Sequence, residues 1–205
     1  MGQIFPIPKI AEWDYSLAST RPIMLLETFR KSLVRIIQKR LSKVLLEKKI
    51  FRGLNFAGLE GESTITPIHI LHNLMEDAKQ QKREMWILLQ DIKKAFDSVS
   101  ITGLRRALNR IQIQGNLEKL LIEIYEKREV RVITKNGLSE GFQAQDGIDQ
   151  GEVISPLIWR IFYDPLLCKI QNSMMGYKMI LPDPIDKDKR EELRVSGLAF
   201  ADDTT

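Results

Sequence analysis

The stretch Met85-Trp-Ile-Leu-Leu-Gln-Asp91-Ile-Lys-Lys-Ala-Phe96-Asp-Ser-Val99 is the part of the sequence on which the fold prediction depends. It opens with five apolar residues, a length typical of a strand buried on both faces. Asp91 follows almost at once, and a carboxylate at the end of a buried strand needs a partner, of which a metal ion is one. The simple alternative is that Asp91 caps a following helix, since aspartate is a common N-cap residue.

A second acidic site closes the sequence, where Leu198-Ala-Phe-Ala leads into Asp202 and Asp203. Adjacent carboxylates repel each other, and a divalent cation would relieve that repulsion. Two strands that deliver Asp91 and this pair to one place would build an oxygen-ligand site of the kind that Mg²⁺ prefers. Spacing alone leaves open whether the strands are neighbours, and Asp203 also suits a turn at a hairpin tip.

Four motifs in a fixed order carry a resemblance to a known family. They are Thr20-Arg-Pro-Ile-x-Leu-Leu26, the Asp91–Val99 stretch, Gly147-Ile-Asp-Gln-Gly-Glu-Val-Ile-Ser-Pro-Leu157 and Phe200-Ala-Asp-Asp203. Together they resemble the reverse transcriptases of non-LTR (LINE-like) retrotransposons, over roughly residues 5–205.

The resemblance implies an α+β right-hand polymerase, with fingers and a palm built on a small antiparallel sheet. Fingers-like parts are expected at about 1–84 and 100–150, and palm-like parts at about 85–99 and 151–205. The family's primer grip and thumb are expected to be missing from this partial domain. Because only Thr204 and Thr205 follow Asp203, we expect no second strand for the hairpin at Asp202-Asp203, and therefore weak primer extension or none.

The implied activity is RNA-directed DNA synthesis, with an RNA template, a DNA primer and deoxynucleoside triphosphates as partners. By resemblance, Asp91 and Asp202 would hold two Mg²⁺ ions, with Mn²⁺ as the alternative ion, and Asp203 would complete the site. Phe96 would lie under the incoming sugar and reject a 2′-hydroxyl by clash. Simple core packing is the competing interpretation of Phe96.

The resemblance also assigns nucleotide-side roles. Gln150 and Gly151 would contact template and nucleotide, and a glycine lets backbone approach a substrate closely. Asp149 stands where many relatives carry a basic residue, so added charge attraction is not expected there. Arg21 is the candidate for gripping the triphosphate, and a surface salt bridge is its alternative.

Charge is concentrated in one region. The chain has 205 residues, 43% of them hydrophobic, and a net charge of +4, yet residues 30–49 alone hold eight basic residues and one acidic residue. Apolar residues recur there at helical spacing, in a helical pattern that opens at Pro22. A one-sided basic helix suits a phosphate backbone, and the motifs around it favour this interpretation over the alternative of a solvated helix face. The predicted nucleic-acid contacts are Arg35, Lys39, Arg40 and Lys43.

Other patterns predict the remaining elements. We expect helices from about 65 to 81, 100 to 111, 116 to 125 and from Ser155 onward, with a kink at Pro165. Asn136-Gly137 predicts a two-residue hairpin turn with a return strand through Phe142. Residues 181–192 are Pro-rich and charged, and read as a surface loop. One cysteine excludes an internal disulfide, and no apolar run approaches the roughly 18 residues of a membrane span.

Two other functions compete with polymerisation. The chain could be a remnant that binds nucleic acid without polymerising, or a carboxylate-metal nuclease. The nuclease hypothesis does not account for the motif from Gln150-Gly151 to Ser155-Pro156, nor for Phe96. The family resemblance implies an intracellular protein with action in the nucleus; oligomeric state is left open.

Overall fold

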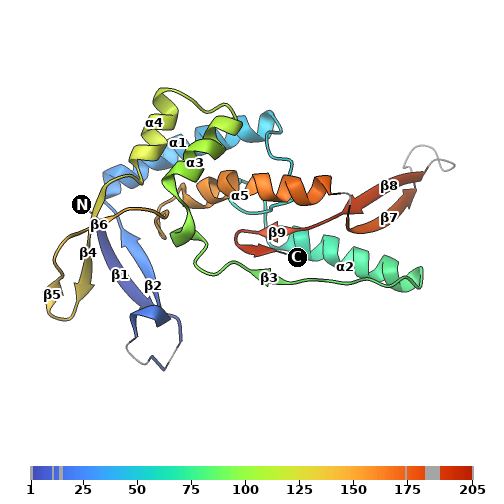
Figure 1. Ribbon diagram of the computed structural model, residues 1–205, viewed down its shortest axis with the longest axis horizontal. Coiled ribbons are helices and arrows are strands. Elements are labelled where there is room, and N and C mark those ends of the chain that lie inside the picture. Colours follow the sequence, from blue (N-terminus) through green and yellow to red (C-terminus); the bar gives the residue numbers. More distant parts are fainter. Residues whose placement is uncertain (1, 11, 14–15, 174, 183–189, 205) are drawn as a thin grey trace.

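The computed structural model describes residues 2–10, 12–13, 16–173, 175–182 and 190–204. Figure 1 shows an elongated α+β arrangement in which helix α5 crosses the middle, with α1, α3 and α4 on one side of it. The helices are α1 (Thr28–Glu47), α2 (Ile65–Gln80), α3 (Ile101–Arg110), α4 (Asn116–Glu123) and α5 (Ser155–Asn172), with 3₁₀ turns η1 (Leu17–Ser19) and η2 (Phe96–Ser98). The strands are β1 (Gly2–Pro8), β2 (Thr20–Leu25), β3 (Gln90–Asp91), β4 (Arg128–Thr134), β5 (Gly137–Leu138), β6 (Phe142–Ala144), β7 (Tyr177–Pro182), β8 (Arg190–Val195), β9 (Ala199–Phe200) and β10 (Asp203–Thr204).

The main core forms where α5 packs against α3 and α4. Leu157, Ile158 and Ile161 of α5 are fully or almost fully buried, together with Leu104 of α3 and Leu121 of α4. Burial of each such side chain stabilises the fold by about 1.5–3 kcal/mol. The predicted helices in these regions are confirmed, and α5 is the central element around which the other segments pack.

Helix α3 begins with a side-chain cap from Ser100. The Ser100 Oγ accepts a hydrogen bond from the Gly103 backbone N–H at 3.0 Å, as an N-cap serine does. Asp97 lies in the preceding η2 turn and is exposed. Ser100, and not Asp97, is therefore the N-cap residue of this helix.

Three sheets are formed by the described residues. The largest has the order β2-β1-β4-β5 with β6 also paired to β4, and all its pairings are antiparallel except the parallel β1–β4 pair. The other two are β3-β10-β9 and β7-β8. The predicted hairpin is confirmed, because Thr134 pairs with Gly137 across a two-residue turn, and so is the return strand through Phe142.

Two boundaries predicted from local sequence are wrong. Pro22 lies in β2, opposite Pro6 of β1, and the helix begins only at Thr28. Proline is tolerated in this position because β2 is an edge strand, paired only with β1. The segment 181–192 is also not simply a loop: residues 181–182 and 190–192 belong to the β7–β8 hairpin, while residues 183–189 lie outside the described part of the chain.

The predicted buried strand at Met85–Leu89 is also wrong. Only Gln90 and Asp91 form β3, and Trp86, Leu88 and Leu89 are 92%, 76% and 73% exposed. Within the described part of the chain, the residues of this segment that pair with β10 are Gln90 and Asp91.

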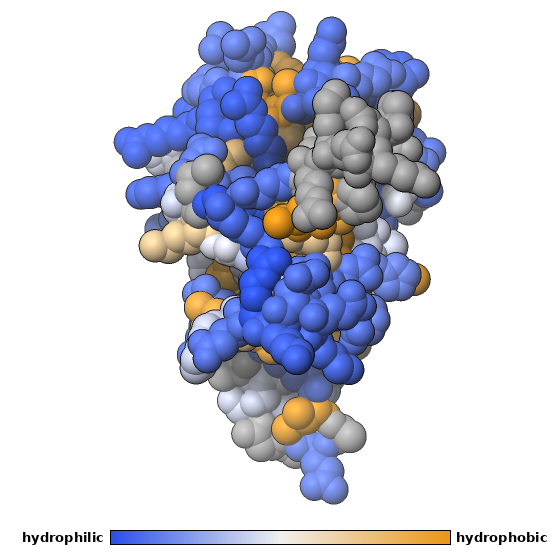
Figure 2. Space-filling model, turned by 90° about the vertical axis from the view of Figure 1, so that its right-hand side faces the viewer, coloured by the Kyte–Doolittle hydropathy of each residue, from blue (hydrophilic) through white to orange (hydrophobic). Residues whose placement is uncertain are grey.

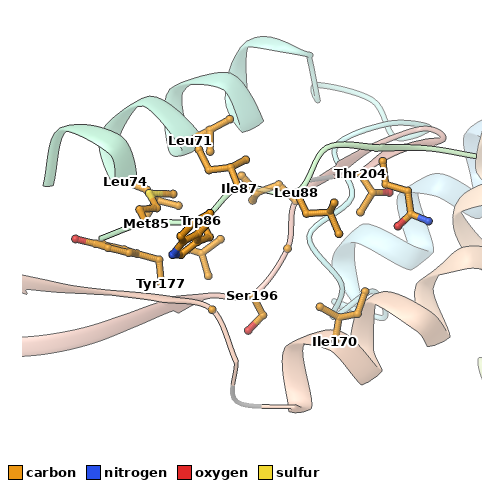
Figure 3. Close-up of a pocket in the computed structure, with 15 residues that line it drawn as sticks. Leu71, Leu74, Met85, Trp86, Ile87, Leu88, Ile170, Tyr177, Ser196 and Thr204 are labelled. Carbon is orange, nitrogen blue, oxygen red and sulfur yellow. The ribbon is translucent and has the colours of Figure 1, made fainter. Parts of the chain in front are cut away.

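Instead, this segment borders an apolar groove of about 300 Å³. Figure 3 shows Leu71 and Leu74 of α2 on one side of it, Met85 and Trp86 beside them, and Tyr177 of β7 nearby. Figure 2 shows that hydrophilic residues dominate this end of the molecule and are interrupted by small hydrophobic patches.

Helices α1 and α2 are less buried than their apolar patterns predict. Leu41 and Leu45 of α1 are buried as expected, but Phe29 is 82% exposed and Ile36 is 52% exposed. In α2, Leu74 and Ala78 are buried and Leu71 is half-buried, while the apolar side chains of Ile68 and Met75 are exposed. No helix in the described ranges has the length and apolarity required to cross a membrane.

Candidate metal and nucleotide site

The two acidic motifs meet in the β3-β10-β9 sheet. Asp203 pairs directly with Asp91 across the antiparallel β3–β10 ladder, and with Phe200 across the β9–β10 hairpin. Figure 1 shows β3 and β9 lying together beside α5, although they come from distant parts of the sequence. Asp91 is in a strand, and η2 has Ala95 at its N-cap, so the helix-cap interpretation of Asp91 is wrong.

The expectation that the hairpin lacks a second strand is contradicted by β10. The chain reverses in a tight turn at Ala201 and Asp202, in which Ala201 takes a left-handed φ of 55°. This turn leaves Asp203 and Thr204 free to form the second strand. Asp202 is therefore the residue at the hairpin tip, and Asp203 is a strand residue facing Asp91.

These three carboxylates form an uncompensated group. Residues directly opposite in an antiparallel pair have Cβ atoms about 4.5–5.5 Å apart, and like charges there are destabilising. Asp91 and Asp203 are exposed, Asp202 is half-buried, and none of them forms an ion pair within the described part of the chain. Such a set fits a hard divalent cation, which neutralises the charge and prefers carboxylate oxygen ligands.

The described residues do not, however, form a closed ligand cage. No three His, Cys, Asp or Glu side chains in the described ranges already converge as a metal-binding group. An open arrangement agrees with Mg²⁺, which keeps several waters and uses one or two carboxylates with substrate phosphates.

The Gln150-Gly151 motif connects the Phe96 turn to strand β2. Backbone N–H groups of Gly147 and Ile148 donate to the carbonyls of Val99 and Phe96 at 2.8 and 2.9 Å. Two residues later, the Gln150 carbonyl accepts from the Met24 N–H at 2.7 Å. The motif thus joins the segment after Asp91 to the segment after Arg21, which brings three of the four predicted motifs into contact.

Gly151 is required by this geometry. Its φ is +106°, and a Cβ placed there would lie 3.0 Å from the Met24 carbonyl oxygen. The expected close backbone approach therefore occurs, but toward Met24 of β2. The close approach of Gly151 to a substrate stays a prediction.

Phe96 and Arg21 have different surroundings. Phe96 is half-buried, with its ring centroid 6.1 Å from that of Trp159, so it contributes to packing while keeping part of its surface open. Arg21 is exposed on β2 opposite Ile7, and it forms no ion pair with any described residue. Among the described residues, no acidic side chain forms the surface salt bridge that was the alternative role of Arg21.

A buried charge network beside the Gln-Gly motif was not anticipated from the sequence. Asp149 is almost fully buried, and its carboxylate accepts from the Arg128 guanidinium and lies 3.6 Å from that of Arg30. Burial raises the pKa of the Asp149 carboxyl from its ordinary value, and the two arginines oppose that shift. Arg30 also donates to Glu152 at 3.1 Å. The signal in the sequence was an acidic residue, Asp149, at a position where the family resemblance implied a basic one.

This network changes the interpretation of the basic helix. Arg30 faces inward and is engaged by Glu152, so it does not belong to the exposed basic face. Arg35, Lys39, Arg40 and Lys43 are all exposed along α1, and Lys43 lies only 3.9 Å from Glu47 in an exposed i,i+4 pair. Such pairs are weak, so these four cations remain available for phosphates.

Comparison with known proteins gives a consistent family. Residues 7–205 match the family model described as reverse transcriptase (RNA-dependent DNA polymerase). The chain is 29% identical over 82% of its length to a probable RNA-directed DNA polymerase from transposon BS of Drosophila melanogaster. It is 25% identical over 96% of its length to a retrovirus-related Pol polyprotein from the type-1 retrotransposable element R2 of Popillia japonica. The chain spans 18% and 26% of the lengths of these two relatives.

Among solved structures, apo telomerase from Candida tropicalis, truncated from its C-terminal domain, has a similar fold. The TM-score is 0.57 at 14% identity, and the match covers 99% of this chain and 42% of the telomerase chain. This likeness supports the mixed α+β fold. The match over residues 7–205 and the retrotransposon relatives together show that the chain belongs to the reverse transcriptase family and is related to the polymerases of non-LTR retrotransposons.

Proposed function

We propose that this chain is the fingers and palm portion of an RNA-directed DNA polymerase, which extends a primer 3′-hydroxyl on an RNA template. The observation that carries the proposal is the pairing of Asp91 with Asp203, next to Asp202 at the hairpin tip. Charge neutralisation and positioning are what phosphoryl transfer chiefly requires from protein. Three unpaired carboxylates at adjoining strand ends would hold the divalent cations that neutralise this charge, and the strands would position them.

Asp91, Asp202 and Asp203 would hold Mg²⁺ or Mn²⁺ in this proposal. When bound, two such ions stabilise the attacking and leaving oxygens of an in-line displacement. The protein's own part is to fix the carboxylates: β3 presents Asp91, β10 presents Asp203, and the turn presents Asp202.

Nucleotide recognition is assigned to the segments that the Gln150 motif joins. Phe96 would lie against the sugar, with its open surface, and Gln150 and Gly151 would support template and nucleotide. Arg21, exposed on the adjoining strand β2, would meet the triphosphate with a guanidinium, which binds phosphate in a bidentate manner.

In this proposal, the fingers comprise about residues 1–84 and 100–150, and the palm comprises about residues 85–99 and 151–205. It is supported by the sheets, since β2-β1-β4-β5 and β6 come from the first set and β10-β9, with β3, come from the second. The exposed cations of α1 would bind the backbone of the template–primer duplex. Intracellular location and action in the nucleus are part of the same proposal, as expected for a retrotransposon enzyme.

Primer extension on an RNA template, run beside filter binding of the same duplex, tests this function. We expect Mg²⁺-dependent extension that Asp202→Asn lowers at least about a hundredfold, because displacing reacting groups by about 1 Å already costs that much. The filter-binding affinity of Asp202→Asn should stay within about twofold.

The second candidate is a nucleic-acid-binding remnant. It is favoured by one observation: no ready-made group of three metal ligands exists among the described residues. Salt-dependent binding without any extension, in Mg²⁺ or Mn²⁺, would establish this alternative and overturn the polymerase proposal for the 205-residue chain.

A further inference from the structure

The hairpin that carries Asp202 and Asp203 is too small to fix its own geometry. Strands β9 and β10 have two residues each, and β3, which pairs with β10, also has two, so this sheet has few ladder hydrogen bonds to hold the turn. The turn also holds Ala201 at a φ of +55°, a left-handed conformation that non-glycine residues seldom adopt. Contacts from outside the hairpin must therefore hold it in place.

Two side chains of α5 make such contacts, one on each side of the acidic pair. The Trp159 Nε1–H donates to the Ala201 carbonyl at 2.8 Å. The Tyr163 hydroxyl lies 3.1 Å from the Thr204 Oγ1, within hydrogen-bond distance. Ala201 immediately precedes Asp202, and Thr204 immediately follows Asp203, so the two contacts bracket the carboxylates.

The two side chains are themselves rigidly held. Trp159 and Tyr163 are 3% and 7% exposed. Their rings lie one helical turn apart, stacked with centroids 5.1 Å apart and an interplanar angle of 16°. Phe96 also packs against Trp159, with ring centroids 6.1 Å apart. The same indole therefore contacts the turn that follows Asp91 and the turn that carries Asp202.

We propose that Trp159 and Tyr163 are positioning residues that set the Asp202 and Asp203 carboxylates against Asp91 for divalent metal binding. The inference rests on the proposed function, because it assumes that these carboxylates hold the metal. Residues that orient metal ligands typically change affinity about 10–100-fold when they are replaced. The indole N–H of Trp159 holds the carbonyl of Ala201, whose backbone has a left-handed φ. The phenol hydroxyl of Tyr163 holds Thr204, on the other side of the acidic pair.

The test uses substitutions that remove only the hydrogen-bonding group: Trp159→Phe, Tyr163→Phe and the double variant. Trp86→Phe is the matched control for the first, because Trp86 is exposed. Tyr177→Phe is the matched control for the second, because the Tyr177 hydroxyl donates to Asp77 at 2.7 Å, away from the hairpin. Asp91→Asn serves as the variant that removes a ligand.

Two measurements on the 205-residue chain are needed. The first is amide hydrogen exchange of residues 199–204 without metal, which should be at least about tenfold faster in the double variant and unchanged in both controls. The second is Mn²⁺ affinity from the electron paramagnetic resonance signal of the free ion. The dissociation constant should rise about tenfold or more in the double variant, with the metal-free thermal melting transition retained.

The outcomes separate the inference from the function on which it rests. Binding that is lost in Asp91→Asn but unchanged in the double variant would overturn the positioning roles alone. Wild-type protein that binds no Mn²⁺, or Asp91→Asn that binds it equally well, would overturn the metal site and the inference together. If Trp159→Phe fails to fold, Tyr163→Phe carries the test, with at least about threefold weaker binding expected and unchanged binding overturning the proposal.

Discussion

Asp91 and Asp203 lie directly opposite each other in the antiparallel β3–β10 ladder. Two exposed carboxylates in this relationship repel each other, and the described part of the chain supplies no cation to separate them. The arrangement is therefore unfavourable for the isolated fold and favourable for a bound divalent ion.

Asp91→Asn should stabilise the metal-free protein. Removing one of two opposed like charges relieves a cross-strand repulsion of about 0.2–1 kcal/mol, so the free energy of unfolding should rise by that amount in chelator-treated buffer. The same substitution should abolish any stabilisation by added Mg²⁺. Urea unfolding with and without Mg²⁺ measures both effects. A lower stability of Asp91→Asn without metal would contradict the repulsion.

Neutralising Arg35, Lys39 and Lys43 with glutamine should weaken binding to RNA–DNA duplexes of different sequence by similar factors. Each phosphate contact contributes about 0.7–0.9 units to the slope of log K against log salt, so the slope should fall by up to about three units. Fluorescence anisotropy at several salt concentrations gives the slope. Glutamine at the exposed Lys82, Lys135 and Lys169 is the equal-charge control, and an identical slope for both triple variants would mean that α1 makes no specific contact.

Phe96→Ala should admit ribonucleotides while leaving synthesis measurable. A half-buried ring beside Trp159 can reject a 2′-hydroxyl only through its open surface, so truncation should lower deoxyribose selectivity at least about tenfold, or about 1.4 kcal/mol. Single-nucleotide extension with both sugars measures the ratio. Phe162→Ala is the matched control, because Phe162 is also half-buried and its ring lies 6.0 Å from that of Trp159. Equal selectivity in the two variants would make Phe96 a packing residue.

Gly151→Ala should destabilise the fold by about 1–3 kcal/mol, the usual range for a residue held in a disfavoured backbone conformation. It should also lower extension, because the new Cβ would press on the Met24 carbonyl and displace Gln150. Gly61→Ala is the control: its φ is +87°, but open space surrounds its Cβ position. Thermal unfolding should show a larger loss for Gly151→Ala, and equal losses would mean that the close approach to Met24 is relaxed at no cost.

The sequence by itself determined the features encoded within short segments. Ser155-Pro156 began the central helix, Asn136-Gly137 made its turn, and the apolar stripes of α3 and α4 were buried as expected. The order of the four motifs also determined the family. These features depend on helical spacing, turn residues and identity, which a linear pattern carries directly.

Tertiary structure alone decided which segments are partners. Met85–Leu89 has the composition of a buried strand, yet in the described structure only Gln90 and Asp91 pair with β10, and four of the five side chains at 85–89 are exposed. Arg30 has the pattern of a surface cation, yet the burial of Asp149 and Glu152 turns it inward. The Trp159 N–H finds a carbonyl to bind only because a distant hairpin folds against α5. Burial and hydrogen bonding depend on what lies opposite in space, and a local pattern holds no information about that.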